Sequence, residues 1–179
     1  MIQQVITHQP VITTDRLTLR PLQASDQGLL SLYAGDARVA ENTRSIPHPL
    51  PPGASEAFVT RALSDTRRED VWAMDASRVG GAELLGVIGL TRLSSDRSEI
   101  AYWVAPAFWN TGFATEALQG ILAANPQGVR TVFAEVFQSN AVSARVLSNG
   151  GFDYIGDAEA FSVAQNRSVP TWTYLKKLA

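Results

Sequence analysis

One stretch, residues 98–116, constrains the fold more than any other, because a strand pattern leads through a short turn directly into a helix pattern. The β-rich apolar run at residues 100–104 stops before Pro106, which cannot extend a central strand. A helical spacing of apolar residues then begins at Ala114. Between them, residues 109–115 present successive backbone N–H groups at a helix N-terminus, where unpaired donors and the helix dipole favour negative charge. The stretch therefore predicts a site for a phosphate-bearing ligand.

The turn reads W-N-T-G-F-A at residues 109–114 and resembles motif A of the GNAT family, the GCN5-related N-acetyltransferases. That motif, Q/R-x-x-G-x-G/A, cradles the pyrophosphate of acetyl-CoA. With Trp109 in the first position, the motif resembles the form found in the RimJ/RimL-like branch of ribosomal-protein N-terminal acetyltransferases. Its usual form there is W-G-K-G-Y/F-A-T-E-A. Here Asn110 replaces a glycine and Thr111 replaces a lysine, so one phosphate-facing charge is missing. Asparagine tolerates left-handed geometry, so we expect the turn to keep its shape.

Three further segments resemble the same family in the same order along the chain. Residues 12–22 resemble its opening strand, T-E/D-R-L-x-L-R-P-L, and residues 99–104 resemble E-I-G-Y-W-V/L. Residues 140–152 resemble motif B, N-x-x-S-x-R-V-L-x-x-x-G-F. The resemblance implies an α/β (α+β) GNAT fold, with a mixed central sheet of about six to seven strands and helices on both faces. At 179 residues, we expect one domain over residues 1–179, with residues 1–11 as a tail.

Local patterns place the expected elements. Strands are expected at residues 17–22, 71–74, 84–93, 98–104, 131–137, 152–156 and 171–176, and helices at residues 55–68, 113–125, 140–149 and from a cap at Ser25 or Asp26 to Ala34. Residues 98–149 then form a β-α-β-α unit, whose strands should be parallel. Residues 46–52 are too rich in proline for regular structure. They form either a wall of the acceptor site, as the resemblance implies, or a rigid connector.

Composition limits the chemistry and the partners. Without cysteine there is no disulfide, no thiolate metal site and no Cys-acyl intermediate, so acyl transfer must be direct or use another nucleophile. The chain has no 18-residue apolar run and no signal-peptide pattern, which predicts a cytoplasmic protein without a membrane partner. A net charge of -2 argues against direct nucleic-acid binding. We expect a monomer or a homodimer.

Proton transfer from an attacking ammonium needs a base, and two glutamates are candidates. Glu99 opens the strand before the turn, where the resemblance implies a general base, although a solvated strand end is the alternative. Glu135 ranks second, because it is out of phase with the apolar residues of its strand. His8 and His48 lie in the tail and the proline loop, where solvated histidines are the usual case, and their spacing suggests no metal site.

Motif B supplies the remaining groups. The resemblance implies that Asn140 contacts the pantetheine arm and that Ser143 hydrogen-bonds the leaving sulfur, because Leu147 stands where many family members carry a tyrosine acid. Asn140 and Ser143 are also ordinary first-turn helix residues. Arg145 is predicted as a surface charge rather than a phosphate contact. The full predicted cofactor-binding set is Trp103, Val104, Trp109, Asn110, Thr111, Gly112, Phe113, Ala114, Thr115, Asn140 and Ser143.

The resemblance implies an acetyl-CoA-dependent N-acetyltransferase that acts through a ternary complex, without a metal. Its acceptor is a primary amine, either a protein N-terminus or a small molecule such as an amino acid, a polyamine or an antibiotic. An alternative outside the enzymes is an acyl-CoA-binding module without useful catalysis. The lack of the motif A lysine and of the motif B tyrosine favours this alternative.

Overall fold

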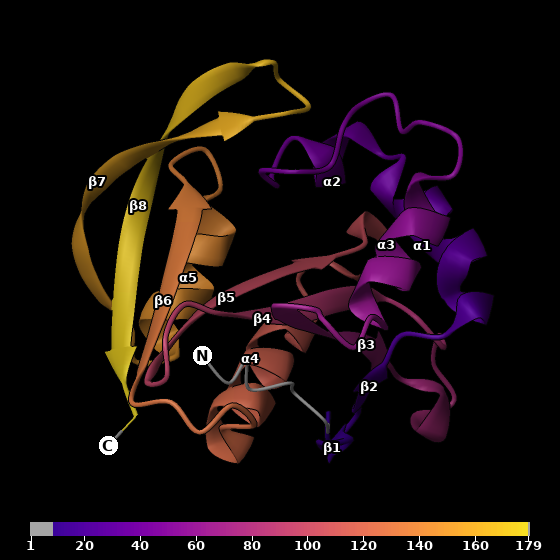
Figure 1. The fold of residues 1–179 in the computed structure, drawn as a ribbon, viewed down its shortest axis with the longest axis horizontal. Helices are drawn as coiled ribbons and strands as arrows, with labels where there is room; N and C mark the ends of the chain where they lie inside the picture. The colour runs from indigo at the N-terminus through magenta and orange to yellow at the C-terminus, as the bar shows by residue number, and fades with distance from the viewer. Residues whose placement is uncertain (1–8, 179) are drawn as a thin grey trace.

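The computed structural model describes residues 9–178 and has one eight-stranded sheet at its centre, in the order β1-β2-β3-β4-β5-β6-β8-β7 (Figure 1). The strands are β1 Ile12–Thr13, β2 Thr18–Pro21, β3 Glu69–Asp75, β4 Gly86–Arg92, β5 Arg97–Val104, β6 Thr131–Phe137, β7 Asp153–Ser162 and β8 Arg167–Lys177. The helices are α1 Gln27–Ala34, α2 Ala37–Ala40, α3 Ala54–Ala62, α4 Phe113–Ala124 and α5 Ala141–Asn149. Short 3-10 helices lie at Ala24–Asp26, Ser77–Val79 and Pro106–Phe108.

The mixed sheet with helices on both faces agrees with the expected α/β architecture, with one strand more than expected. The additional strand is β1, whose two residues pair antiparallel with the start of β2. Residues 9–11, expected in a tail, are instead attached to the sheet. The Gln9 side chain donates to the Val71 carbonyl at 2.8 Å, and the Trp72 indole donates to the Pro10 carbonyl at 2.8 Å. His8 lies outside the described residues.

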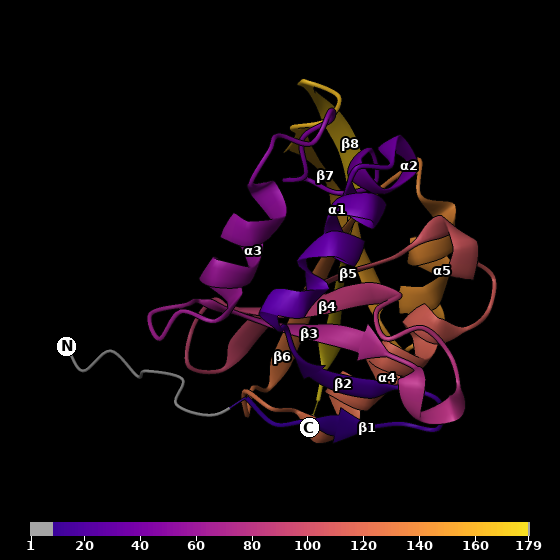
Figure 2. The ribbon, with the colours of Figure 1, turned by 90° about the vertical axis from the view of Figure 1, so that its right-hand side faces the viewer.

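The helices divide between the two faces of the sheet (Figure 2). On one face, α4 and α5 bury Leu118, Ile121 and Leu147 against the largest apolar cluster. On the other face, α1 and α3 pack Leu30 and Val59 against β3 and β4 in a second cluster. Because side chains alternate along a strand, the central strands β3, β4 and β5 each contribute to both clusters. These three strands therefore separate the two apolar clusters.

All neighbouring strands are antiparallel except β5 and β6, which are parallel as predicted for the β-α-β-α unit. Their pairing covers only Arg97↔Thr131, Ser98↔Val132 and Glu99↔Phe133, although β5 continues to Val104 and β6 to Phe137. Beyond Glu99 the two strands therefore diverge. We call this gap the splay.

One helix and the two closing strands differ from their expected limits by more than two residues. The helix expected over residues 55–68 ends at Ala62, and the chain beyond it forms a turn in which Arg67 donates to Ser64 O at 3.1 Å and to Asp70 at 2.9 Å. The closing strands are longer than expected and form the β7–β8 hairpin. Most β7 side chains are exposed, so an alternating apolar pattern is missing there. No helix within residues 9–178 is long and apolar enough to cross a membrane.

Candidate active site

Two cavities meet at the splay. The larger one, about 730 Å³, lies on the face covered by α1 and α3, between the sheet and the loop that follows α2. The smaller one, about 420 Å³, lies beside the turn that precedes α4. Residues that line both cavities are Asn42, Tyr102, Trp103, Asn140 and Ser143. A molecule in one cavity therefore reaches a molecule in the other through the diverging strands.

The turn at the smaller cavity exposes a row of backbone donors. Asn110 and Gly112 both adopt left-handed conformations, with φ of 61° and 80°. The first helical bond of α4 runs from Glu116 N to Gly112 O. Within the described residues, the six N–H groups at positions 110–115 have no hydrogen-bond acceptor. Together with the positive end of the α4 dipole, this arrangement suits a pyrophosphate.

Hydrogen bonds to β5 and to the segment before β2 hold the turn in place. The Trp109 indole donates to the Val104 carbonyl at 2.7 Å, which fixes the turn to the end of β5. Glu116, in the first turn of α4, accepts from Thr14 Oγ1 at 2.6 Å and from Arg16 Nε at 2.8 Å. The Arg16 guanidinium also lies 4.1 Å from the centre of the Phe113 ring. Burial opposes ionisation of Glu116, yet these hydrogen bonds lower its pKa overall.

Helix α5 brings polar groups to the junction of the cavities. The Asn140 side chain caps α5 by accepting from Ser143 N at 3.3 Å. The Ser143 hydroxyl has no hydrogen-bond partner within residues 9–178, and its residue lines both cavities. The Tyr102 hydroxyl donates to the Ser143 carbonyl at 3.2 Å. Burial raises the pKa of Tyr102 well above its usual range, so this tyrosine stays protonated.

The two predicted carboxylates share one cation. Arg44, in the loop after α2, pairs with Glu135 at 3.2 Å through Nη1 and with Glu99 through Nη2. Thr171 of β8 also donates to Glu135 at 3.0 Å. Glu135 lines the larger cavity, whereas Glu99 is not among the residues that line either cavity. Both oxygens of Glu135 are therefore engaged, whereas Glu99 keeps Oε2 without a hydrogen bond within the described residues.

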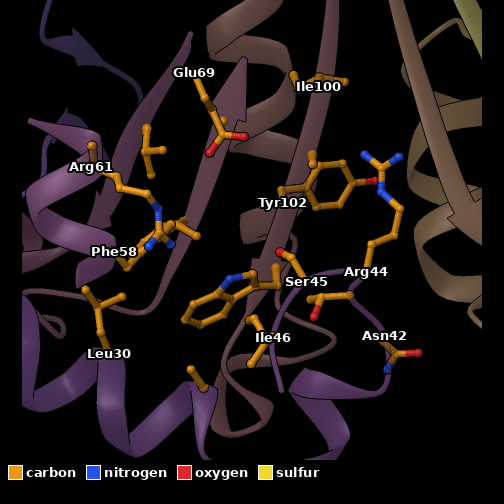
Figure 3. A pocket seen from close by; sticks show the side chains of 18 of the residues that line it. Leu30, Asn42, Arg44, Ser45, Ile46, Phe58, Arg61, Glu69, Ile100 and Tyr102 are labelled. Atoms are coloured by element: carbon orange, nitrogen blue, oxygen red, sulfur yellow. The ribbon is translucent and has the colours of Figure 1, made fainter. Parts of the chain in front are cut away.

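A third glutamate, Glu69 at the start of β3, was not a sequence-based candidate. Its carboxylate points into the larger cavity (Figure 3) and accepts from Thr91 Oγ1 at 3.0 Å. Burial raises the pKa of Glu69 above its ordinary value, and the nearby charge of Glu99 adds to the shift. The Thr91 hydrogen bond and the charges of Arg44 and Arg61 oppose it.

Comparison with known proteins assigns this arrangement to a family. The acetyltransferase (GNAT) domain matches residues 16–153, which is well over half of the chain. The chain belongs to the GNAT acetyltransferase family. It is therefore an acetyl-CoA-dependent N-acetyltransferase. The relatives of this GNAT enzyme include the uncharacterised N-acetyltransferase YoaA of Bacillus subtilis, which is 30% identical over 156 residues that cover 82% of this chain and 85% of YoaA.

Two solved structures resemble the enzyme in fold. The ribosomal L7/L12 α-N-protein acetyltransferase RimL, in complex with coenzyme A, has a TM-score of 0.76 at 18% identity and covers 94% of this chain and 96% of its own. Spermidine N-acetyltransferase from Vibrio cholerae, in complex with CoA and spermine, has a TM-score of 0.73 at 17% identity and covers 91% of this chain and 98% of its own.

In this GNAT enzyme, nearly all of the predicted cofactor-binding residues lie together. The smaller cavity is lined by Trp103, Val104, Trp109, Asn110, Gly112, Phe113, Ala114, Thr115, Asn140 and Ser143. Thr111 is the exception, because its exposed side chain turns back to donate to the Phe108 carbonyl. Arg145 is exposed, in agreement with its prediction as a surface charge.

The proline loop lies at the larger cavity, as one of its two interpretations proposed. Ile46, Pro47 and Leu50 line the cavity wall, whereas the exposed His48 does not. Within residues 9–178, no three His, Cys, Asp or Glu residues come close enough to hold a metal ion. Sequence reasoning missed Arg44 and Glu69 because nothing in their local patterns indicates which strands lie beside them.

Proposed function

We propose that acetyl-CoA occupies the smaller cavity, that a cationic primary amine occupies the larger cavity, and that acetyl transfer takes place at the splay. The observation that carries this proposal is the meeting of the two cavities at Asn140 and Ser143. One cavity offers unpaired N–H donors, which suit phosphate, and the other offers carboxylates, which suit an ammonium. Each substrate thus has an electrostatically matched binding site.

For the cofactor, the pyrophosphate accepts hydrogen bonds from the N–H groups at positions 110–115. The pantetheine arm, which carries two amide groups, then runs along the edge of β5 that lacks a β6 partner beyond Glu99. An extended chain with amides binds such an edge as an added strand would. This path brings the thioester to Ser143, whose hydroxyl donates to the sulfur as negative charge develops on it.

For the acceptor, Glu69 and Glu135 face the larger cavity, and their charges draw in a cation. Glu99 stays the sequence-based prediction for the general base. Arg44 pairs with its Oε1, and Oε2 has no hydrogen bond within residues 9–178, so in this role Oε2 takes the proton. The walls formed by Ile46 and Leu50 suit the apolar part of an amine.

Both acceptor classes, unblocked peptide N-termini and small amines, have support from the fold. A RimJ/RimL-like assignment favours peptide N-termini, and the likeness to RimL supports it. The likeness to a spermidine N-acetyltransferase supports small amines to a similar degree. We further propose one cytoplasmic catalytic domain that acts as a monomer or a homodimer.

A thiol-release assay with acetyl-CoA tests the proposal. The acceptors, at matched concentration, are free-amine peptides, the same peptides with blocked N-termini, polyamines and hydroxyl compounds. We expect turnover with free amines only. Faster transfer to a hydroxyl, or to a blocked peptide with an internal lysine, would contradict the acceptor assignment. CoA binding by calorimetry without turnover on any acceptor would instead favour an acyl-CoA-binding module.

A further inference from the structure

Glu69 belongs to a row of side chains that crosses the sheet on the face of the larger cavity. Register places Glu69 opposite Thr91 on β4, and Thr91 opposite Glu99 on β5. The next row on this face holds Gly89 opposite Ala101. Along β5, this second row is one step closer to Trp103, which lines both cavities.

The Glu69 carboxylate extends from its own row over Gly89 in the second row. A Cβ atom at position 89 would stand only 3.1 Å from Glu69 Cδ and 3.2 Å from Oε1. The glycine at position 89 therefore provides the space in which the carboxylate lies. One oxygen, Oε2, is fixed by the Thr91 hydroxyl, and Oε1 accepts no hydrogen bond within residues 9–178. The carboxylate is thus held by one oxygen and open at the other, on the side toward the splay.

The other two carboxylates of the site differ from Glu69 in their partners. Glu99 and Glu135 both pair with Arg44, and Glu135 also accepts from Thr171. Glu69 has no ion-pair partner within the described residues. Of the three, only Glu69 lines the larger cavity, has no ion-pair partner within the described residues and keeps an oxygen without a hydrogen bond.

We propose that Glu69 is the general base of this enzyme and that its Oε1 takes a proton from the acceptor ammonium in the larger cavity. This inference rests on the proposed function. Glu69 removes one proton from the ammonium, and the free amine attacks the carbonyl carbon of the thioester. The N–C bond forms and the C–S bond breaks, with the electron pair leaving on sulfur. The sulfur takes the second amine proton to give CoA thiol, the third stays on the amide, and Glu69 releases its proton to solvent.

The surroundings of Glu69 suit this step. Burial raises the pKa of Glu69, which brings its basicity closer to that of the amine. The Glu99 carboxylate adds to this rise in pKa and the Thr91 hydrogen bond opposes it. Neither residue lines the larger cavity, so both change the pKa of Glu69 from outside the acceptor site. Thr91 and Gly89 are accordingly positioning residues.

The first test compares Glu69→Gln with Glu56→Gln, a change at an exposed glutamate of α3. Glu69→Gln keeps the shape and the Thr91 partner but cannot take a proton. We expect it to lower kcat by roughly 10²-fold, with CoA affinity by calorimetry unchanged, and Glu56→Gln to match the wild type. Near-normal kcat in Glu69→Gln, with a large loss in Glu99→Gln, would overturn the inference and support Glu99 as the base.

The second test follows the acidic limb of the kcat/KM profile in variants that retain Glu69. Thr91→Val removes a hydrogen bond that lowers the pKa of Glu69, so the limb should move to higher pH. Glu99→Gln removes a charge that raises the pKa, so the limb should move to lower pH. Gly89→Ala should lower kcat by displacing the carboxylate. An unchanged limb in both Thr91→Val and Glu99→Gln would overturn the inference.

A third measurement does not need turnover. The side-chain carboxyl 13C resonance of Glu69 is assigned by its absence in Glu69→Gln and followed as spermidine or trialanine is added to the CoA-loaded protein. We expect the Glu69 resonance to shift with at least one of these amines. Wild-type turnover together with an unshifted resonance contradicts the inference alone. CoA binding without turnover and without a shift contradicts both the inference and the proposed function.

Discussion

The turn before α4 and the wall of the larger cavity are built in opposite ways. The turn is one continuous segment, and its binding groups are backbone N–H donors at positions 110–115. The cavity wall collects its charged groups from far apart in the chain, with Arg44 from a loop, Glu69 from β3 and Glu135 from β6. One site depends on backbone conformation, and the other depends on the identity of single side chains.

This difference explains which substitutions each site tolerates. Asn110 and Thr111 depart from the family pattern, yet the turn keeps its left-handed residues and its open donors. A similar change at Glu69 would remove a charge that no neighbour replaces. We therefore expect the turn to respond to changes in φ, and the cavity to respond to changes in charge.

The largest expected effect is at Gly112. Its φ of 80° strains any residue with a β-branched side chain, whereas the space for a Cβ is open, with Arg16 Nη2 at 3.5 Å. Gly112→Val should cost about 1–3 kcal/mol and weaken CoA binding accordingly. Gly80→Val is the matched control, since Gly80 has a φ of 83° and open space but lies outside the two cavities. Equal CoA affinities in the two folded variants would remove the turn from the site.

The second-largest effect is expected at Glu116, which supports the turn before α4. Its pKa is lowered in the folded protein, so its contribution to stability is present above the unfolded pKa of about 4.3 and is lost as pH falls through the folded value. Glu116→Gln should reduce the free energy of unfolding near neutral pH by about 1–2 kcal/mol and flatten its decline below about pH 5. Urea denaturation across pH measures both. The exposed Glu159→Gln should leave the curve unchanged, and identical curves for both variants would contradict the role of Glu116.

A smaller effect is expected where the cavities meet. Ser143→Ala removes the hydroxyl proposed to stabilise the leaving sulfur, which should lower kcat about fivefold, equivalent to about 1 kcal/mol. The CoA dissociation constant should hardly change. Ser148→Ala, at an exposed position of the same helix, is the control. A kcat in Ser143→Ala equal to that of Ser148→Ala would exclude the hydroxyl from catalysis.

The smallest effect is expected at Arg44. Arg44→Gln removes the cation that neutralises Glu99 and Glu135, so the cavity becomes more negative. The KM for a cationic amine should fall roughly threefold at low ionic strength, and less in high salt. The exposed Arg130→Gln serves as the charge-matched control. A raised KM would indicate that Arg44 itself holds the acceptor.

The same contrast explains what the sequence predicted. The β5 strand, the turn and α4 were placed within two residues of their observed limits, and β6 was placed at its observed limits. In these segments, apolar spacing and local turn chemistry determine the structure. The position of Glu69 depends instead on the register of three strands, which brings Gly89 beneath its carboxylate. No pattern within one sequence encodes that register. The long β7–β8 hairpin was underestimated because its exposed edge strand carries no apolar alternation.

Two hydrogen bonds link the loop at the larger cavity to a distant part of the chain. The tip of the β7–β8 hairpin lies beside the loop after α2 (Figure 1), where Val163 N donates to Arg44 O at 3.0 Å and the Gln165 side chain donates to Glu41 O at 3.1 Å. Neither segment contributes to the turn before α4. The hairpin tip lines neither cavity, whereas the loop lines both through Asn42. A substitution at the hairpin tip can therefore alter the larger cavity through the backbone of Arg44 while it leaves the turn before α4 untouched.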